Sequence, residues 1–263
     1  MKISVISLCR ILLAIVVCYW GFVLPLNAQP NSVSGASKAS PKTTFIFKKV
    51  EDTLKKQFEK SSCKWPPEAM YLRSFKYDRE LEVWIRNTGE EKFQLFKTYR
   101  VCMQSGAMGP KRMEGDYQVP EGFYYIDEFN PNSMYHLALG LNYPNASDRI
   151  LSDSRRPGGN IFIHGNCVST GCIPIMDGPM EELYVLASYI KNEGEQEFIP
   201  VHVFPIKYNV KKSQEYLESA MNVNPDLKTF NEPLRDAFHY FEVHKSIPIV
   251  LINRDGSYLV SGK

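Results

Sequence analysis

The sequence predicts a mostly β fold with accessory helices, in the α+β class. Short apolar or alternating stretches recur between turn signals from residue 70 to residue 206, which is typical of antiparallel strands. Helical spacing of apolar residues is confined to segments that flank or interrupt this region. The 263 residues are 44% hydrophobic and 23% charged, an ordinary globular composition that allows a sizeable core.

The N-terminal segment predicts export. Two basic residues accompany an uncharged apolar run from Ile11 to Leu24, and a small residue, Ala28, follows. This pattern is typical of a secretory signal peptide over residues 1–28. The alternative is a retained membrane anchor, but the run is shorter than the roughly 20 apolar residues that a span needs. Residues 29–43, rich in Ser, Pro, Ala and Lys, predict a flexible linker.

The charge balance indicates which partners to expect. Without the two basic residues of the signal segment, the 31 basic residues fall to 29, which equals the 29 acidic ones. A neutral chain lacks the basic footprint that nucleic-acid binding requires. We therefore expect a protein of the periplasm or cell envelope, without nucleic acid or cofactor. Membrane contact is expected only through the N-terminal segment, if it is not cleaved.

The elements follow in order from periodicity. A helix is predicted over Phe45–Lys60, and three antiparallel strands in a meander are predicted next. Those strands are Met70–Phe75, Leu81–Arg86 and Phe93–Met103. A long loop rich in Gly, Pro and charge then leads to an aromatic strand at Phe123–Tyr125, and loops of this kind are often functional.

The remaining elements complete two parts of the chain. Strands are predicted at Tyr135–Leu141, Ile161–Ile163 and Ile199–Ile206, with a polar loop at Asp148–Gly159 and a helix from Asp177 to about Asn192. We place His202 in the last of these strands as a partly buried structural residue. Two helices, Gln214–Val223 and Phe230–His244, and a hairpin around Asp255-Gly256 follow. We expect a catalytic domain at 44–207 and an extension at 208–263 that packs on it.

The stretch 161–175, IFIHGNCVSTGCIPI, concentrates the chemistry. It holds one imidazole, His164, two thiols, Cys167 and Cys172, and a turn whose amides could face a ligand. A thiol has a pKa near 8.5, so a nucleophilic cysteine needs a base. His164 at a strand end could supply it. Cys172 is the favoured nucleophile because it follows Gly171 in a small turn, where the amides of both residues could face an oxyanion.

Two other interpretations of this stretch stay open. Four cysteines remain after the signal segment, Cys63, Cys102, Cys167 and Cys172, and two bridges would leave no free thiol. A Cys167–Cys172 disulfide would staple the loop. A zinc site is the second alternative, with His164, Cys167 and Cys172 as ligands and a fourth from Cys102, His136 or His202, although structural zinc usually shows paired ligands in both halves.

Several separated motifs carry a resemblance. The pattern HG-x-C-x-S-x-GC followed by Ile-Pro-Ile resembles the active-site signature of the L,D-transpeptidase (YkuD-type) catalytic domain family, and its YafK-like branch most closely. The resemblance extends over roughly residues 69–207. Its other motifs are Leu81–Ile85, Ser105-Gly106, Gly109–Lys111, Glu114–Asp116, Pro120–Tyr124 and Tyr143–Asn145.

The resemblance implies a β-sandwich or barrel catalytic domain with flanking helices and a cysteine nucleophile that acts on peptidoglycan stem peptides. It implies Cys172 as nucleophile and His164 as general base, with Cys167 accessory. The residues implied to line the site and its oxyanion pocket are Gly165, Ser169, Thr170 and Gly171. We also expect Lys111, Arg112, Tyr143 and Arg149 to contact substrate, with Lys111, Arg112 and Arg149 binding stem-peptide carboxylates, which arginine suits through bidentate hydrogen bonds. Exposed loop charges are the alternative for the basic residues.

The sequence departs from the common family pattern at two positions. Thr170 stands where that pattern has histidine, and Pro174 stands at a later polar position. The YafK-like branch includes hydrolases that release a protein lysine from diaminopimelate. A peptidoglycan amidase, with a peptidoglycan-attached protein as partner, is therefore an alternative to a transpeptidase. A non-catalytic peptidoglycan-binding module is a third.

Overall fold

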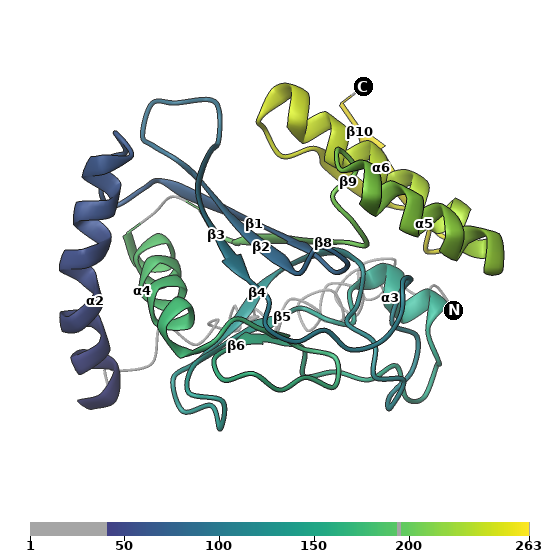
Figure 1. Ribbon diagram of the computed structural model, residues 1–263, viewed down its shortest axis with the longest axis horizontal. Coiled ribbons are helices and arrows are strands. Elements are labelled where there is room, and N and C mark those ends of the chain that lie inside the picture. The colour runs from purple at the N-terminus through teal and green to yellow at the C-terminus, as the bar shows by residue number, and fades with distance from the viewer. Residues whose placement is uncertain (1–40, 194–195, 263) are drawn as a thin grey trace, which may run out of the picture. The chain divides into compact units, whose positions relative to one another are not determined.

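The computed structural model describes residues 41–193 and 196–262 (Figure 1). The predicted signal segment and residues 29–40 of the predicted linker lie outside the described residues. Residues 41–43 are not a linker, because helix α2 spans Pro41–Lys60. Proline suits the first helical position, where its missing N–H costs no hydrogen bond. In the described ranges no helix is long and apolar enough to cross a membrane.

Eight strands of the described chain form one curled sheet, with the order β3-β2-β1-β8-β4-β5-β6-β7. The strands β1 to β3 are antiparallel neighbours, which confirms the predicted meander. The pairs β1–β8 and β6–β7 are parallel. The bounds are β1 Ala69–Phe75, β2 Glu80–Arg86, β3 Gln94–Arg100, β4 Gly122–Asn130, β5 Ala138–Leu141, β6 Phe162–His164, β7 Ile173–Pro174 and β8 Pro200–Phe204.

Two short elements were not predicted. Helix α3 (Ala146–Leu151) occupies the start of a segment predicted as turn and polar loop. A capping box begins it, in which the Asn145 side chain accepts from the Asp148 backbone and the Asp148 side chain accepts from the Asn145 backbone. Strand β7 has two residues, which is too short for periodicity to indicate.

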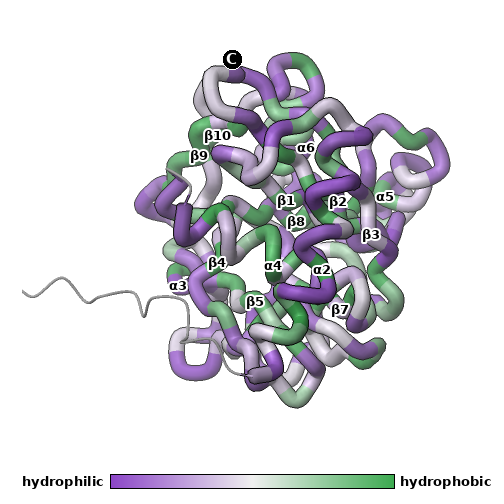
Figure 2. Tube along the Cα trace, turned by 90° about the vertical axis from the view of Figure 1, so that its left-hand side faces the viewer, coloured by the Kyte–Doolittle hydropathy of each residue, from purple (hydrophilic) through white to green (hydrophobic). Residues whose placement is uncertain are grey.

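Helix α4 (Asp177–Glu193) fills the inside of the curl. It contacts β1, β5 and β6 on one side and α2 on the other (Figure 1). Its middle is strongly hydrophobic in Figure 2. The apolar spacing of this helix predicts one buried face, and the six residues of that face are buried: Met180, Leu183, Tyr184, Leu186, Ala187 and Ile190. Val185 and Ser188 are buried as well. Helices α2 and α4 therefore build the main core together with the sheet. Leu54 and Phe58 of α2 and Ile163 of β6 belong to this core.

The C-terminal part covers the opposite face of β1, β2 and β8. Its elements are α5 (Lys211–Val223), α6 (Asp226–His244) and the hairpin β9 (Ile249–Ile252) and β10 (Tyr258–Ser261). Phe238 on α6 packs against Phe75 on β1 and Phe204 on β8, with ring centroids 6.0 and 5.9 Å away. All seven residues of β1 are buried as a result, since both faces of the strand are covered.

His202 on β8 is fully buried, deeper than the partly buried position predicted for it. Its Nδ1 lies 2.6 Å from the Tyr71 hydroxyl. Burial, with the charge of Arg73 on the neighbouring strand, lowers the pKa of His202 to about 3. The residue is therefore a neutral part of the core.

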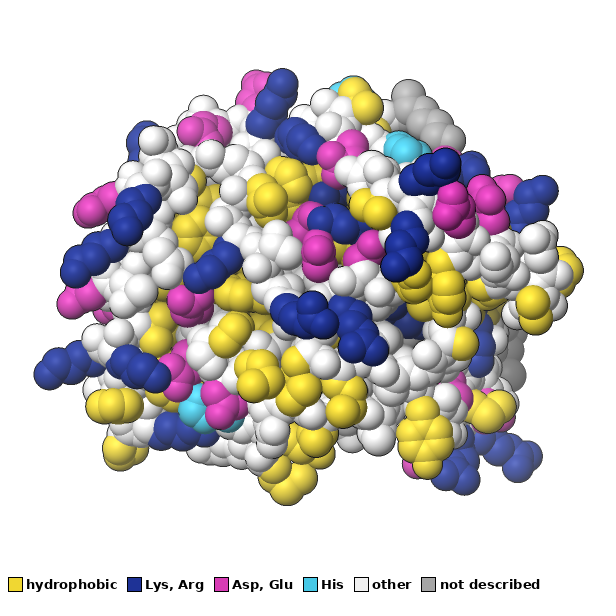
Figure 3. Space-filling view, viewed as in Figure 1, with side chains coloured by type: hydrophobic (Ala, Val, Ile, Leu, Met, Phe, Trp, Pro, Cys, Tyr) yellow, Lys and Arg dark blue, Asp and Glu magenta, His cyan; other side chains and the backbone are white. Residues whose placement is uncertain are grey.

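Charges of both signs are interspersed on the face shown in Figure 3. On that face, lysines and arginines alternate with carboxylates and apolar side chains. Elsewhere in the structure charges are paired, as in the bonds of Lys207 to Glu80 and Glu82. This surface agrees with the neutral balance of the chain after residue 28.

We predict that Phe238→Ala will lower the free energy of unfolding by about 3–5 kcal/mol, because a fully buried ring is removed between α6 and the sheet. Urea unfolding measures the change. The matched control is Val243→Ala on the same helix, where the side chain is 73% exposed and the cost should stay below about 0.5 kcal/mol. Equal effects of the two changes would contradict this packing.

Candidate active site

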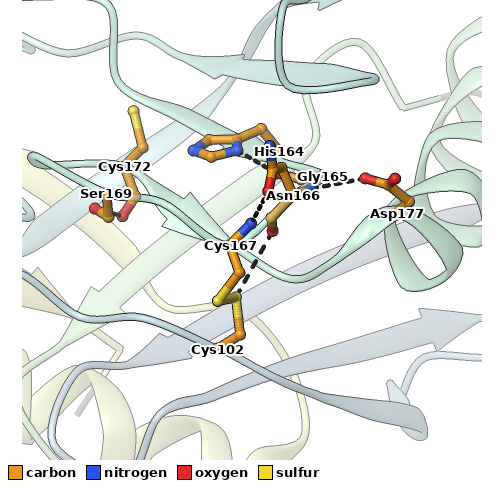
Figure 4. Close-up of a disulfide and its surroundings, with 8 residues drawn as sticks. All are labelled: Cys102, His164, Gly165, Asn166, Cys167, Ser169, Cys172 and Asp177. Atoms are coloured by element: carbon orange, nitrogen blue, oxygen red, sulfur yellow. Dashed lines mark hydrogen bonds between the residues drawn. A yellow bond between two sulfur atoms is a disulfide. The ribbon is translucent and has the colours of Figure 1, made fainter.

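The two edge strands of the sheet meet at the candidate site. Cys102 follows β3, the first strand in the order, and Cys167 precedes β7, the last. These two residues form a disulfide with their Cα atoms 5.8 Å apart (Figure 4). The Cys102 backbone N–H also donates to the carbonyl of Pro174 on β7, at 3.0 Å. The disulfide and this hydrogen bond therefore tie the curl together beside residues 164–172.

This disulfide defines which of the four cysteines are bonded and which are free. Cys63 and Cys172 are free, and Cys63 is buried. The alternative of a Cys167–Cys172 disulfide is wrong, because Cys167 is bonded to a cysteine 65 residues away. The zinc alternative loses two ligands to the same bond, and its other candidates are engaged elsewhere. His136 pairs with Glu181, and His202 lies inside the sheet.

His164 is the last residue of β6, as predicted, and is only 1% exposed. Its Nδ1 lies 2.5 Å from the Gly165 carbonyl, which can only accept, so Nδ1 carries the proton. The other ring nitrogen, Nε2, is therefore unprotonated in the neutral ring, and it lies on the side of Cys172 in Figure 4. The Tyr135 ring packs on the imidazole with centroids 4.7 Å apart.

The turn after His164 is fixed by close packing and by Asp177. The Asn166 N–H donates to Asp177 Oδ1 at 2.7 Å, which ties the turn to the start of α4. A Cβ on Gly165 would lie 2.6 Å from that same oxygen and 2.7 Å from the Tyr135 carbonyl. Only glycine fits there. The predicted site residue Gly165 therefore contributes its carbonyl and its lack of a side chain.

Cys172 is half-buried, with its thiol 3.6 Å from the Asn160 carbonyl. Burial raises the pKa of Cys172, while a backbone hydrogen bond from Phe162 and the charge of Lys111 act in the opposite direction. Burial lowers the pKa of His164, against the opposing effect of its bond to Gly165. The resting pair is therefore a neutral thiol beside a neutral base.

Ser169 holds the turn of residues 169–172 together. Its hydroxyl donates to the Cys172 carbonyl at 2.7 Å and accepts from the Gly171 N–H at 3.2 Å. The Gly171 amide is thus engaged, which corrects the expectation that it faces an oxyanion. Gly171 is needed for its backbone instead, since its φ is +137° and a Cβ would lie 3.0 Å from the Gln118 carbonyl. Thr170 is exposed on the same turn.

The four predicted substrate contacts divide into two groups. Lys111 is buried in an ion pair with Asp116, Arg112 pairs with Asp148 at 3.3 Å, and the Tyr143 hydroxyl donates to the Pro157 carbonyl at 2.9 Å. These three side chains contact protein groups and stabilise the loops around the site. The charge of Lys111 also acts to lower the pKa of Cys172. Arg149 is exposed on α3.

Several contributors to the site were missed at the sequence level. The partner of Cys167 and the brace at Asp177 come from remote segments, and only the even cysteine count hinted at the first. The aromatic cover at Tyr135 and the amide of Phe162 carry no local signal. The orienting carbonyl of Gly165 belongs to the backbone, which the sequence does not specify.

Comparison with known proteins places the chain in a family. Residues 75–203 match the model of the YkuD family, the L,D-transpeptidase catalytic domain. Over 194 residues the chain is 30% identical to "Putative L,D-transpeptidase YafK" of Escherichia coli strain K12, covering 73% of this chain and 74% of that protein. The corresponding protein of Escherichia coli O157:H7 matches equally. The chain belongs to the L,D-transpeptidase (YkuD) family.

Similar solved structures include a cell-shape protein. The helical cell shape determining protein Pgp2 from Campylobacter jejuni is 18% identical with a TM-score of 0.41, over 80% of each chain. Its K307A mutant is 19% identical with a TM-score of 0.43, over 76% of this chain and 69% of that one. Bd1075 of Bdellovibrio bacteriovorus is 21% identical with a TM-score of 0.39, over 72% and 78%.

We predict that a Cys102→Ser/Cys167→Ser double variant will be less stable by about 2–5 kcal/mol, because a cross-link across 65 residues is lost. Urea unfolding with and without reductant measures this. Reductant should lower the midpoint of the native protein to that of the double variant and leave the variant unchanged. A native midpoint that does not respond to reductant would contradict the bond.

The His164 imidazole should titrate below 6.5, because burial disfavours its charged form. The unfolded chain then binds this proton at a higher pH than the folded protein does. Folding therefore becomes less favourable as the pH falls below about 6.5. NMR titration of the ring protons measures the pKa, and Tyr135→Ala should move it toward 6.5 by admitting water. A native value at or above 6.5 would contradict this environment.

Proposed function

We propose that this protein is an exported cysteine acyltransferase that acts on peptidoglycan stem peptides. The observation that carries the proposal is the free Cys172 thiol beside a buried, neutral His164 whose Nδ1 is fixed by a carbonyl. A nucleophile, a base and a group that orients the base are the parts of covalent acyl transfer. Family membership supplies the substrate class.

The proposed reaction has two steps. His164 Nε2 takes the Cys172 proton while sulfur attacks the carbonyl carbon of the stem peptide. The bond to the leaving amine breaks, and His164 returns the proton to that amine, which leaves a thioester on Cys172. An incoming amine or water then attacks the thioester, His164 takes its proton, and the thiol is regenerated. The Phe162 hydrogen bond supports the developing thiolate, and the Cys172 amide is our candidate oxyanion donor.

The identity of the acceptor separates transpeptidase from amidase. The name of the Escherichia coli relatives, an L,D-transpeptidase, supports the first. The second is favoured by Thr170 and Pro174, which stand where the common family pattern has polar groups. Pro174 is buried in β7 and gives its carbonyl to Cys102, so this position serves closure of the sheet. A site with fewer polar groups to hold an acceptor amine is more open to water.

Two features support the proposal of export. The N-terminal segment has the charge and apolar pattern of a secretory signal. The Cys102–Cys167 disulfide is of the kind that forms and persists in oxidising compartments such as the periplasm. Peptidoglycan lies in the same compartment.

We predict that Cys172→Ala will abolish release or exchange of stem-peptide groups on purified sacculi, because no thioester can form. His164→Gln should lower the rate by about 10²- to 10⁴-fold through loss of the base. Mass spectrometry of soluble products measures both. Cys63→Ala, which changes the other free thiol, is the matched control and should retain activity. Full activity of Cys172→Ala would overturn the proposal, and binding of the native protein to sacculi without turnover would favour a binding module.

The acceptor is tested with the native enzyme and sacculi, with and without an added D-amino acid. An amidase yields the same hydrolysed stem in both reactions, and a transpeptidase yields the exchanged stem in proportion to the amine. The ratio of the two products assigns the outcome.

A further inference from the structure

A groove of about 610 Å³ lies between β4, α3 and the C-terminal hairpin. Figure 2 shows these elements gathered on one side of the molecule. Cys172 and His164 are not among the residues that line the groove. Its lining combines aromatic and aliphatic surface with a guanidinium, a carboxylate and an amide. The lining includes Tyr125, Asp127, Asn142, Arg149, Val250 and Tyr258.

The aromatic side chains that line the groove are held in place by neighbouring aromatic rings and a hydrogen bond. The half-buried Tyr125 packs against Phe198 with ring centroids 4.6 Å apart. Tyr258 stands perpendicular to Phe123 at 4.8 Å, and its hydroxyl accepts from the Asn145 side chain at 2.8 Å. Because these contacts already fix both rings, ligand binding does not have to order them. A flat apolar surface that is already rigid loses little conformational entropy when it binds a ligand.

The polar groups of the groove include both donors and acceptors. Arg149 is anchored through its Nε, which donates to the Pro144 carbonyl at 3.1 Å. The carbonyl oxygen of the Asn142 side chain accepts from the Tyr125 N–H at 2.9 Å, which orients its amide group. Asp127 is exposed and adds a carboxylate.

We infer that this groove binds a neutral saccharide, namely a short segment of the peptidoglycan glycan strand. The apolar C–H face of a pyranose ring matches a rigid aromatic surface, and its hydroxyl and acetamido groups match donors and acceptors together. A stem-peptide carboxylate fits less well, since Asp127 would repel it. The identity of this glycan rests on the proposed function. Arg149, predicted to contact stem-peptide carboxylates, is thereby assigned to the sugar.

The test measures binding in the Cys172→Ala protein, so its result does not depend on catalysis. The probe is the tetramer of N-acetylglucosamine, followed by chemical-shift changes in NMR spectra. We expect saturable shifts confined to the groove, and dissociation constants at least about tenfold weaker in Tyr125→Ala and Arg149→Ala. The matched controls are Tyr216→Ala on α5 and Arg155→Ala, both outside the groove lining, and they should bind as the parent does.

Three outcomes would overturn the inference. The tetramer could fail to bind, it could bind with unchanged affinity when Tyr125 or Arg149 is replaced, or a sugar-free stem tripeptide could occupy the groove in its place. Failure of the acyltransferase proposal has a different signature, namely full turnover by Cys172→Ala. Each proposal can therefore fail while the other stands.

Discussion

The covalent link between Cys102 and Cys167, with the hydrogen bond from the Cys102 amide to Pro174, is the constraint on which the site depends. Strands β3 and β7 are the two ends of the sheet, and without this link the turn that carries Cys172 would be attached beside β7 only through a two-residue strand. With it, the turn is held at three points, by the disulfide, by Asp177 at the start of α4 and by Ser169 within the turn. The geometry of His164 and Cys172 follows from this closure.

The side chains of His164 and Cys172 are uncharged in the free protein because both are partly shielded from water. Burial raises the pKa of Cys172 and lowers that of His164, so both neutral forms are favoured near pH 7. In the proposed reaction a neutral imidazole is the competent base, and a neutral thiol is protected from adventitious oxidation. In the proposed reaction, charge develops only when a substrate carbonyl arrives, and the Phe162 amide and the Lys111 charge then favour the thiolate.

The sequence predicted those features that are local. Strands such as Leu81–Arg86 and the apolar face of α4 are set by periodicity, and they are confirmed. The motif around Cys172 indicated the family to which the chain belongs. What could not be predicted depends on contacts between remote segments: the Cys102 partner exists only because the sheet curls, and Lys111 became a buried brace because Asp116 lies next to it. The Gly171 amide was assigned wrongly because the Ser169 side chain competes for it.

The most direct test of this account is mass spectrometry of the protein quenched in acid during turnover of a stem peptide, with no reductant added. We predict an acyl group on the peptide that contains Cys172, while the peptides of Cys102 and Cys167 remain cross-linked to each other. An acyl group elsewhere, or Cys172 itself oxidised to Cys167 in the active protein, would contradict the account.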